Sequence, residues 1–298
     1  MQPTEKKKNR KDRKDAWFIS GLDPMHVFMP YLLPERTANE AVLAEMFELA
    51  ALDAYIAKKN ADNPEFKYTF FHAICAAIAK TMALRPRMNS FIAGHRYYEK
   101  KEISLSFVVK REFRDESDEA LAIVRVDKNA EESALSQVYG QVKHFVTKVR
   151  KEQATDGATD VMATLAGFPR FAIKFFVWAI NRMEYHGVLP SSLLDDDPYH
   201  CSAFIANLGS IKMNADYHHL TNWGTNSFFC VVGEKGKHPY YNADGSCELR
   251  EALKLSFTID ERVADGVYFA KSIRILRRLL SEPELLDRPM NEPLELEV

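Results

Sequence analysis

The stretch LSFTIDERVADGVYFAKSIRILRRLLSEPELL, residues 255–286, contains a strand pattern, a charged turn and a helix pattern in direct succession. Leu255, Phe257 and Ile259 alternate with more polar residues, as in a strand with one buried face. The turn DERVADG, residues 260–266, carries three acids and one arginine. After it, apolar residues recur at helical spacing: Phe269, Ala270, Ile273, Leu276 and Leu280. The stretch therefore predicts a strand that turns sharply into an amphipathic helix.

The overall composition is that of an ordinary globular protein. The chain has 298 residues, of which 46% are hydrophobic and 28% are charged. Its net charge of −2 gives no global field that favours nucleic acid, so we predict no nucleic-acid partner. The four cysteines have no CxxC spacing and no matching histidine pattern. We therefore expect reduced thiols, no disulfide framework and no metal site.

The N-terminal segment and the apolar runs of the sequence indicate where in the cell the protein is located. No apolar stretch follows the basic N-terminus, and no uncharged run approaches the roughly 20 residues of a membrane span. We expect a cytoplasmic protein without a signal peptide or transmembrane segment. Residues 1–16 include the run EKKKNRKDRKD and predict a basic, disordered arm. The alternative is an arm that docks on an acidic surface of a partner or neighbouring subunit.

Periodicity along the rest of the chain, residues 17–298, predicts one mixed α/β domain without repeats or linkers. Apolar residues at helical spacing predict helices over 39–60, 69–84 and 130–152. Alternating or continuous apolar runs predict strands at 103–110, 120–126, 200–208 and 226–233, and another that enters the turn at 260.

The segment 163–190 is the most apolar in the chain, but Pro169, Arg170 and Lys174 interrupt it and exclude a membrane span. It predicts an extra apolar helix near 163–185 that packs in the core or at a subunit interface. The alternative interpretation is a helix that covers an acyl group or lies on a membrane surface.

Three separated stretches together resemble one known family. They are RPRMNSFIAG (85–94), FIANLGSIKMN (204–214) with GTNSFFCVVGEKG (224–236), and IDERVADGVYFAKSIRILRRLLSEPELL (259–286). In this order they resemble the catalytic domain of the 2-oxo acid dehydrogenase acyltransferases and their relative chloramphenicol acetyltransferase. The resemblance covers residues 17–286. It implies an α/β two-layer sandwich with a large mixed sheet, and a homotrimer whose active sites lie between two subunits.

The resemblance also implies a site. The family signature is His-x-x-x-Asp-Gly, in which the histidine is the general base, the aspartate holds an arginine and the glycine permits the turn. Asp265 and Gly266 match this pair, but Glu261 stands in place of the histidine. Ala206 stands where the family has a serine whose hydroxyl stabilises the oxyanion. We take Glu261, Asp265 and Gly266 as candidate catalytic residues.

The two replacements have unequal chemical costs. A free thiol has a pKa of about 8.5, compared with about 6.5 for histidine and about 4.3 for glutamate, so an unperturbed glutamate is the poorer base by about 3 kcal/mol. Burial can repair that deficit. A lost oxyanion donor typically costs about 10²–10³ in rate, and Ala206 has no donor.

The pair His218 and His219, in ADYHHLTNWG, offers an alternative base from a loop expected near the site between subunits. The other interpretation of this pair is a surface or structural role. Asn222, in the same loop, matches an asparagine found in many family members, and we expect it to make polar contacts.

Two functions follow as hypotheses. The first is an acyltransferase, hence a transferase, that uses coenzyme A or acyl-CoA as substrate and an unknown thiol or hydroxyl as acceptor. The alternative is a non-catalytic relative, a pseudoenzyme, that binds acyl-CoA or a protein partner or completes an assembly. The chain has no lipoylation-type turn, so we expect no lipoyl group on it. The stretch DRPMNEPLELEV after Leu286 is acidic, unlike the apolar segment that joins trimers in the family's large cores, so we expect a bare trimer. A third idea makes the helix at 168–183 and the basic arm a membrane-surface device.

Overall fold

The computed structural model describes residues 9–110, 119–152, 166–195 and 197–294. Its centre is a seven-stranded sheet in the order β2-β10-β8-β7-β5-β6, with β9 paired to the other end of β10. Strand β7 is parallel to both β5 and β8, whereas the other pairs are antiparallel. The strands are β2 (Glu40–Glu48), β5 (Ile103–Lys110), β6 (Glu119–Val126), β7 (Ala203–Asn207), β8 (Phe228–Val232), β9 (Gly236–Tyr241) and β10 (Cys247–Asp260).

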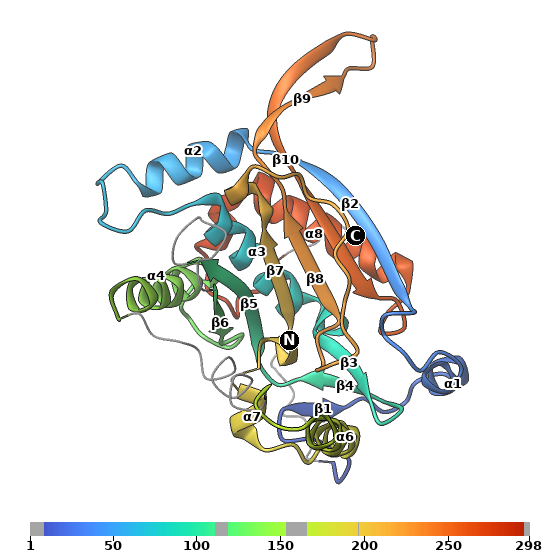
Figure 1. Ribbon diagram of the computed structural model, residues 1–298. Helices are drawn as coiled ribbons and strands as arrows, with labels where there is room; N and C mark the ends of the chain where they lie inside the picture. Colours follow the sequence, from blue (N-terminus) through green and yellow to red (C-terminus); the bar gives the residue numbers. More distant parts are fainter. Residues whose placement is uncertain (1–8, 111–118, 153–165, 196, 295–298) are drawn as a thin grey trace.

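A second, antiparallel sheet of three short strands lies beside the central one, in the order β1-β4-β3 (Figure 1). Its strands are β1 (Ala16–Phe18), β3 (Ser90–Ala93) and β4 (Arg96–Lys100). Ala16, Phe91 and Tyr98 form its own small core. This sheet joins the N-terminal segment to the turn that follows the third helix.

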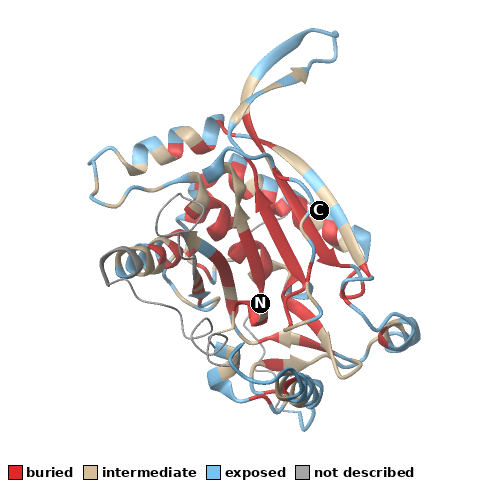
Figure 2. Ribbon diagram, in the orientation of Figure 1, coloured by how far each residue is buried: buried red, intermediate tan, exposed pale blue. Residues whose placement is uncertain are grey.

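The α-helices form a layer on one face of the central sheet and several outlying elements. They are α1 (Pro24–Leu32), α2 (Ala50–Lys59), α3 (Phe70–Leu84), α4 (Ala134–Glu152), α6 (Arg170–His186), α7 (Ser191–Asp195) and α8 (Gly266–Ser281). Helix α3 is apolar except for His72, Lys80 and Thr81, and it is buried from His72 to Met82. Figure 2 shows the helix largely buried. With α4 and α8 it covers the sheet, so the domain is a two-layer α/β sandwich.

The other face of the sheet is only partly covered. Because side chains alternate along a strand, Ala203 and Ile205 of β7 face the helices, whereas Phe204 and Ala206 face the opposite side. The segment 212–226 crosses this second face, and its Leu220 packs with Phe204. The central sheet thus has a helix face and an open face.

A buried ion cluster closes the end of β10. Asp260 is fully buried and accepts two hydrogen bonds from the guanidinium of Arg262, from Nε at 2.7 Å and from Nη2 at 2.6 Å. A second buried arginine, Arg36, lies 3.8 Å from the same carboxylate. Burial lowers the pKa of Arg36 to about 10, so it remains charged at neutral pH. Two guanidinium groups therefore share one carboxylate.

The expected elements are confirmed within a few residues except at one place. The predicted helix over 39–60 is wrong in its first half, where β2 pairs with β10 from Glu40↔Asp260 to Glu48↔Ala252. The spacing of apolar residues there fits both a helix and a strand. Pairing with β10 along the whole segment makes it a strand. The acidic connection expected over 111–119 lies largely outside the described residues.

The predicted disorder of residues 1–16 is wrong for residues 9–16. Arg13 is buried, and its Nη2 donates a hydrogen bond of 2.8 Å to Glu184 of α6. Residues 1–8 lie outside the described residues. The apolar segment forms the helix α6, in which Ile180 is the one buried residue among those described, so in a single chain it does not pack in the core. The other expected position, at a subunit interface, stays a prediction. The N-terminal segment and α6 therefore stabilise each other at the edge of the domain.

We predict that Asp260→Asn lowers the free energy of unfolding by about 3–5 kcal/mol, because it leaves two buried guanidinium groups without a counter-charge. The matched control is Glu45→Gln, which breaks the exposed pair between Glu45 and Arg277 and is expected to change stability little. Urea unfolding followed by circular dichroism measures both. Equal effects of the two substitutions would contradict the assigned role of the cluster.

Candidate functional site

The turn after β10 holds the three residues that match the family signature. Glu261 is exposed, and its backbone N–H donates to the carbonyl of Asn39. Asp265 caps α8, since its carboxylate accepts a hydrogen bond of 2.8 Å from the backbone N–H of Tyr268. In one copy of the chain, Glu261 lacks the burial that a carboxylate base for a thiol needs.

Two details of the turn differ from what the resemblance implied. The arginine is held by Asp260, as described above, whereas Asp265 is engaged at the helix terminus. Gly266 does not have a positive φ, and a Cβ atom there would meet no atom within 4 Å. The backbone conformation of this turn therefore does not require glycine at position 266.

The open face of the sheet contains a pocket of about 400 Å³. It lies between the ends of β5, β6, β7 and β8 and the segment 212–226 that crosses them. Its wall includes Ala206, His218 and His219, three positions that the sequence singled out. The remaining lining residues are Val108, Leu121, Tyr199, Phe204, Leu220, Thr221, Asn226 and Phe229.

His218 is fixed in this pocket by stacking and by its backbone. Its ring lies parallel to that of Phe229, with 4.0 Å between the centroids and 9° between the planes. Its carbonyl accepts a hydrogen bond of 2.5 Å from the Thr258 hydroxyl of β10. Its Nδ1 lies 3.1 Å from the carbonyl of His219. A carbonyl can only accept, so Nδ1 carries the proton and Nε2 of the neutral ring has the lone pair.

His219 has the same arrangement but is more exposed. Its Nδ1 donates over 2.7 Å to the carbonyl of Leu220, so its Nε2 is also the basic nitrogen. Among the residues that the structure describes, neither Nε2 has a hydrogen-bond partner. Both imidazoles can therefore accept a proton from a molecule in the pocket.

Asn222 does not line this pocket. Its Oδ1 accepts hydrogen bonds from the backbone N–H groups of Arg36 (3.0 Å) and Thr37 (3.2 Å), and its Nδ2 donates to the Thr37 hydroxyl. These contacts join the histidine loop to the segment before β2, and a role of Asn222 in the site stays a prediction. Asn222 therefore supports the loop from outside the pocket.

Sequence reasoning missed Tyr199 and Asn226 as polar residues of the pocket wall. Asn226 is buried, and its Nδ2 donates to the carbonyl of Cys201 over 3.2 Å. Tyr199 stacks on Phe204, with ring centroids 5.8 Å apart. No local pattern marks either residue, because each reaches the pocket only through the path of its connecting segment.

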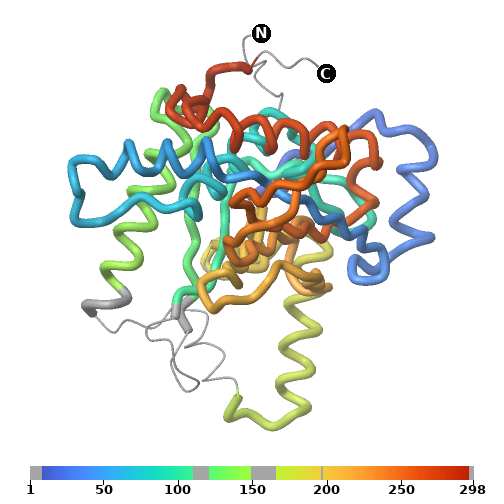
Figure 3. The backbone as a smooth tube through the Cα atoms, turned by 90° about the horizontal axis from the view of Figure 1, so that it is seen from above, coloured from blue at the N-terminus to red at the C-terminus, as the bar shows by residue number. Residues whose placement is uncertain are grey.

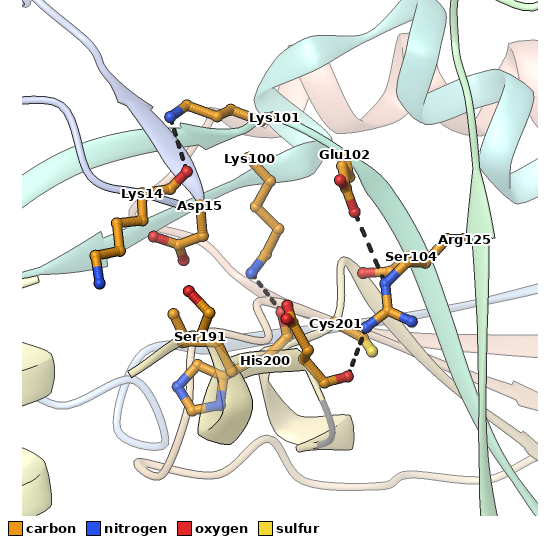
Figure 4. A pocket seen from close by; sticks show the side chains of 12 residues that line it. Lys14, Asp15, Lys100, Lys101, Glu102, Ser104, Arg125, Ser191, His200 and Cys201 are labelled. Atoms are coloured by element: carbon orange, nitrogen blue, oxygen red, sulfur yellow. Dashed lines mark hydrogen bonds and ion pairs between the residues drawn. The ribbon is translucent and has the colours of Figure 1, made fainter. Parts of the chain in front are cut away.

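A second, smaller pocket of about 190 Å³ has in its wall Lys14 and Asp15, just before β1, the end of β4 and helix α7. Figure 4 shows the side chains that line it. Lys100 is buried in its wall and donates hydrogen bonds to the carbonyl of His200 (2.7 Å) and to the Thr225 hydroxyl (2.6 Å). Burial lowers the pKa of Lys100 to about 8. Sequence reasoning did not single out this lysine, since its burial depends on strands that are distant in the chain.

His200, which also lines this pocket, joins two acids. Its Nδ1 lies 3.0 Å from Asp197 and its Nε2 lies 3.3 Å from Glu184, which also pairs with Arg13. Burial lowers the pKa of His200, but the hydrogen bonds to Asp197 and Glu184 outweigh it, and the net shift is upward. Burial raises the pKa of each acid, yet the hydrogen bond to His200 and the neighbouring positive charge lower it overall.

These shifts fix the pH range of the stabilisation. Because the pKa of His200 is raised in the folded protein, His200 stabilises the fold fully at pH values below its ordinary pKa of 6.5. This contribution is lost as the pH rises through the pKa of the folded state. The lowered pKa of Glu184 means that its contribution is present above 4.5 and is lost as pH falls. The network is therefore most stabilising between these two ordinary values.

We predict that the melting temperature falls between about pH 6 and about pH 7.5, and that His200→Gln removes most of this pH dependence. Differential scanning fluorimetry at matched ionic strength measures it. The highest pH of the measurement, about 7.5, stays below the pKa of Lys100, about 8. Above that pKa, Lys100 makes stability rise with pH, which opposes the effect of His200. His238→Gln, on β9, is the control. An unchanged pH dependence in His200→Gln would show that another group titrates.

Among the described residues, no group of three or more histidines, cysteines, aspartates or glutamates is arranged to hold a metal ion. No protein-family model matches the chain, and no curated protein matches it in sequence. Solved structures do match it.

The cubic core of the pyruvate dehydrogenase multienzyme complex is 18% identical, with a TM-score of 0.58 over 88% of this chain and 88% of that one. A dihydrolipoamide acetyltransferase of Azotobacter vinelandii, in whose mechanism a serine, a histidine and an asparagine were investigated, is 18% identical, with a TM-score of 0.57 over 89% of this chain and 93% of that one.

A chloramphenicol acetyltransferase is 10% identical, with a TM-score of 0.51 over 91% of this chain and 99% of that chain. These likenesses extend over nearly the whole of both chains in each case. The protein therefore has the chloramphenicol acetyltransferase-like fold that these acyltransferase structures share.

Proposed function

We propose that this protein transfers an acyl group between coenzyme A and a thiol or hydroxyl acceptor, with an imidazole of the His218–His219 pair as the general base. The observation that carries the proposal is the pocket on the open face, where both imidazoles lie in one wall with Ala206. Ala206 is the position aligned with the family's oxyanion serine. The shared fold supports the reaction class.

The chemistry of the proposed step follows from the tautomers. Nε2 of His218 or His219 takes the proton of the acceptor as its oxygen or sulfur forms a bond to the thioester carbonyl carbon. The π electrons of the thioester carbonyl move to the carbonyl oxygen and give a tetrahedral oxyanion beside a positive imidazolium. Collapse of this intermediate breaks the bond to the coenzyme A sulfur, which receives the proton from the imidazolium.

The apolar part of the pocket suits the acyl chain. Phe204 and Phe229 stack with 5.0 Å between their centroids, and together with Leu121 they provide an apolar wall behind the imidazoles. A pocket of about 400 Å³ lies within the size range of small-molecule sites. In the proposal the acyl group lies against these rings, and its thioester is exposed to the basic nitrogen.

We further propose that the protein acts as a homotrimer. The exposed turn at Glu261 belongs, in the family that the sequence resembles, to a site completed by a neighbouring subunit. In that assembly Glu261 would be covered by the neighbour and would contribute to the same reaction as a second base. Sedimentation equilibrium, which gives the mass of the assembly directly, tests this part of the proposal.

A non-catalytic role is the second candidate, and a specific observation favours it. Ala206 supplies no hydroxyl to the pocket, and one of the two N–H groups of the Asn226 amide is donated to the carbonyl of Cys201. Without the hydroxyl that the family carries at this position, the pocket would bind an acyl-CoA more readily than it would turn it over.

We predict that His218→Gln lowers the rate of coenzyme A release by about 10²–10⁴, the usual contribution of a general base. Purified protein is mixed with acetyl-CoA or longer acyl-CoA esters and a thiol or alcohol acceptor, and free thiol is followed with a chromogenic disulfide or by chromatography. His219→Gln is measured in parallel, and the variant that keeps full activity identifies the residue that is not the base.

His238→Gln, with unchanged activity, is the matched control, and melting curves establish that all variants are folded. Release no faster than in a solution without protein would contradict the transferase. A rise in melting temperature on addition of coenzyme A esters, without turnover, would instead support the non-catalytic binder. If the protein shows no turnover and its melting temperature does not change with coenzyme A esters, both candidate functions are overturned.

We predict that Ala206→Ser raises the rate of transfer, by up to about 10²–10³, because it adds a hydroxyl donor to the wall that faces the developing oxyanion. The same coenzyme A release assay measures it. Ala206→Cys, of similar size but with a weak donor, is the control for volume. An equal change in both variants would show that pocket shape, and not hydrogen bonding, sets the rate.

A further inference from the structure

Helix α6 carries a stripe of aromatic side chains on its outward side. Phe171, Phe175, Trp178 and Tyr185 recur at intervals of four, three and seven residues, so they lie along one side of the helix. Phe171 is 77% exposed and Trp178 is 61% exposed. In Figure 3, α6 extends away from the body of the domain. The stripe therefore faces solvent along most of the helix.

The contacts of α6 with its own domain use a different side. Ile180 is buried, and Ile173 and Phe176 are half-buried. Glu184 turns toward the domain, where it pairs with Arg13 and His200. Apart from Tyr185, whose ring meets His95, the aromatic stripe is thus not part of the packing that holds α6 in place.

The charges next to the stripe are positive. Arg170, Lys174 and Arg182 are exposed, and the guanidinium of Arg182 lies 5.2 Å from the centre of the Tyr185 ring. Glu184 is the one acid in the sequence of α6, and it is engaged on the inner side. The outward surface of the helix is therefore apolar and cationic, although the whole chain has a net charge of −2.

Helix α1 extends this surface. Its sequence, PMHVFMPYL, contains no lysine, arginine, aspartate or glutamate. Met25, Phe28, Tyr31 and Leu32 are each more than 60% exposed. His95 joins the two helices, because its ring stacks on Tyr31 with 4.4 Å between centroids and meets Tyr185 at 5.6 Å. Figure 1 shows α1 and α6 at the same end of the molecule.

We propose that this α1–α6 surface docks on the interface of an anionic lipid bilayer. An aromatic stripe with lysine and arginine beside it is typical of helices that lie in the headgroup region. The long stems of Lys174 and Arg182 can lie along the apolar surface while their charges reach lipid phosphates.

The mode of attachment is peripheral. No helix among the described residues is long and apolar enough to cross a bilayer. The apolar side chains of α1 and α6 would enter the boundary between headgroups and acyl chains, and the basic side chains would hold the protein to negative charge. Binding therefore depends both on anionic lipid and on ionic strength.

The test is flotation of the purified protein with vesicles of phosphatidylcholine alone or of phosphatidylcholine with phosphatidylglycerol, at low and high salt. We expect at least 10-fold more protein to float with the anionic vesicles at low salt, and a blue shift in tryptophan emission on binding. Phe175→Ser with Trp178→Ser should abolish flotation, and Lys174→Glu with Arg182→Glu should abolish the preference for anionic lipid.

The matched control is Tyr241→Ser with Leu249→Ser, which removes two exposed apolar side chains from the β9–β10 hairpin, 78% and 65% exposed. Its flotation should equal that of the unchanged protein. Absence of flotation with anionic vesicles would overturn the proposal. A smaller assembly mass in light scattering for the Phe175→Ser, Trp178→Ser variant alone would also overturn it, by showing that the stripe is an interface between copies of the chain.

Discussion

The buried carboxylate of Asp260 holds together the parts of the molecule that surround the candidate site. It binds Arg262 through both oxygens and lies near Arg36. Arg262 in turn donates to the carbonyls of Leu33 and Pro34, which fixes the connection between α1 and β2. Arg36 donates to the carbonyls of Thr221 and Gly224, which fixes the segment after the histidine pair. One buried charge thus positions three segments that are distant in the sequence.

This arrangement separates the family signature from the pocket that contains bases. The turn 260–266 keeps its ion pair and its helix cap, both of which are structural contacts. The basic nitrogens lie instead on the segment that crosses the open face, held by Thr258 and by stacking on Phe229. The mechanism we propose therefore moves the base from the end of β10 to the loop beside it, while the sheet and its pocket remain those of the fold.

The sequence could predict the elements wherever one period of apolar residues was unambiguous. Helix α3, nearly all apolar, and the strands β5, β7 and β8 were predicted correctly for this reason. At Glu40–Glu48 the same residues fit a helix and a strand, and only pairing with the long β10 distinguished the two. The candidate residues of the turn and of the histidine loop were visible as motifs, whereas Tyr199, Asn226 and Lys100 carried no local signal.

By itself, the sequence predicted a mixed α/β domain, because alternation and helical spacing are local properties of the chain. Its resemblance to a known family added the two-layer sandwich and drew attention to the Asp265-Gly266 turn and the histidine loop. The tertiary structure alone decided which of these residues share a pocket. Burial, ring stacking and hydrogen bonds between distant segments place Ala206 with His218 and His219 and leave Glu261 exposed. It also decided that the aromatic side of α6 faces outward, since amphipathic spacing shows that a helix has an apolar side but not what that side meets.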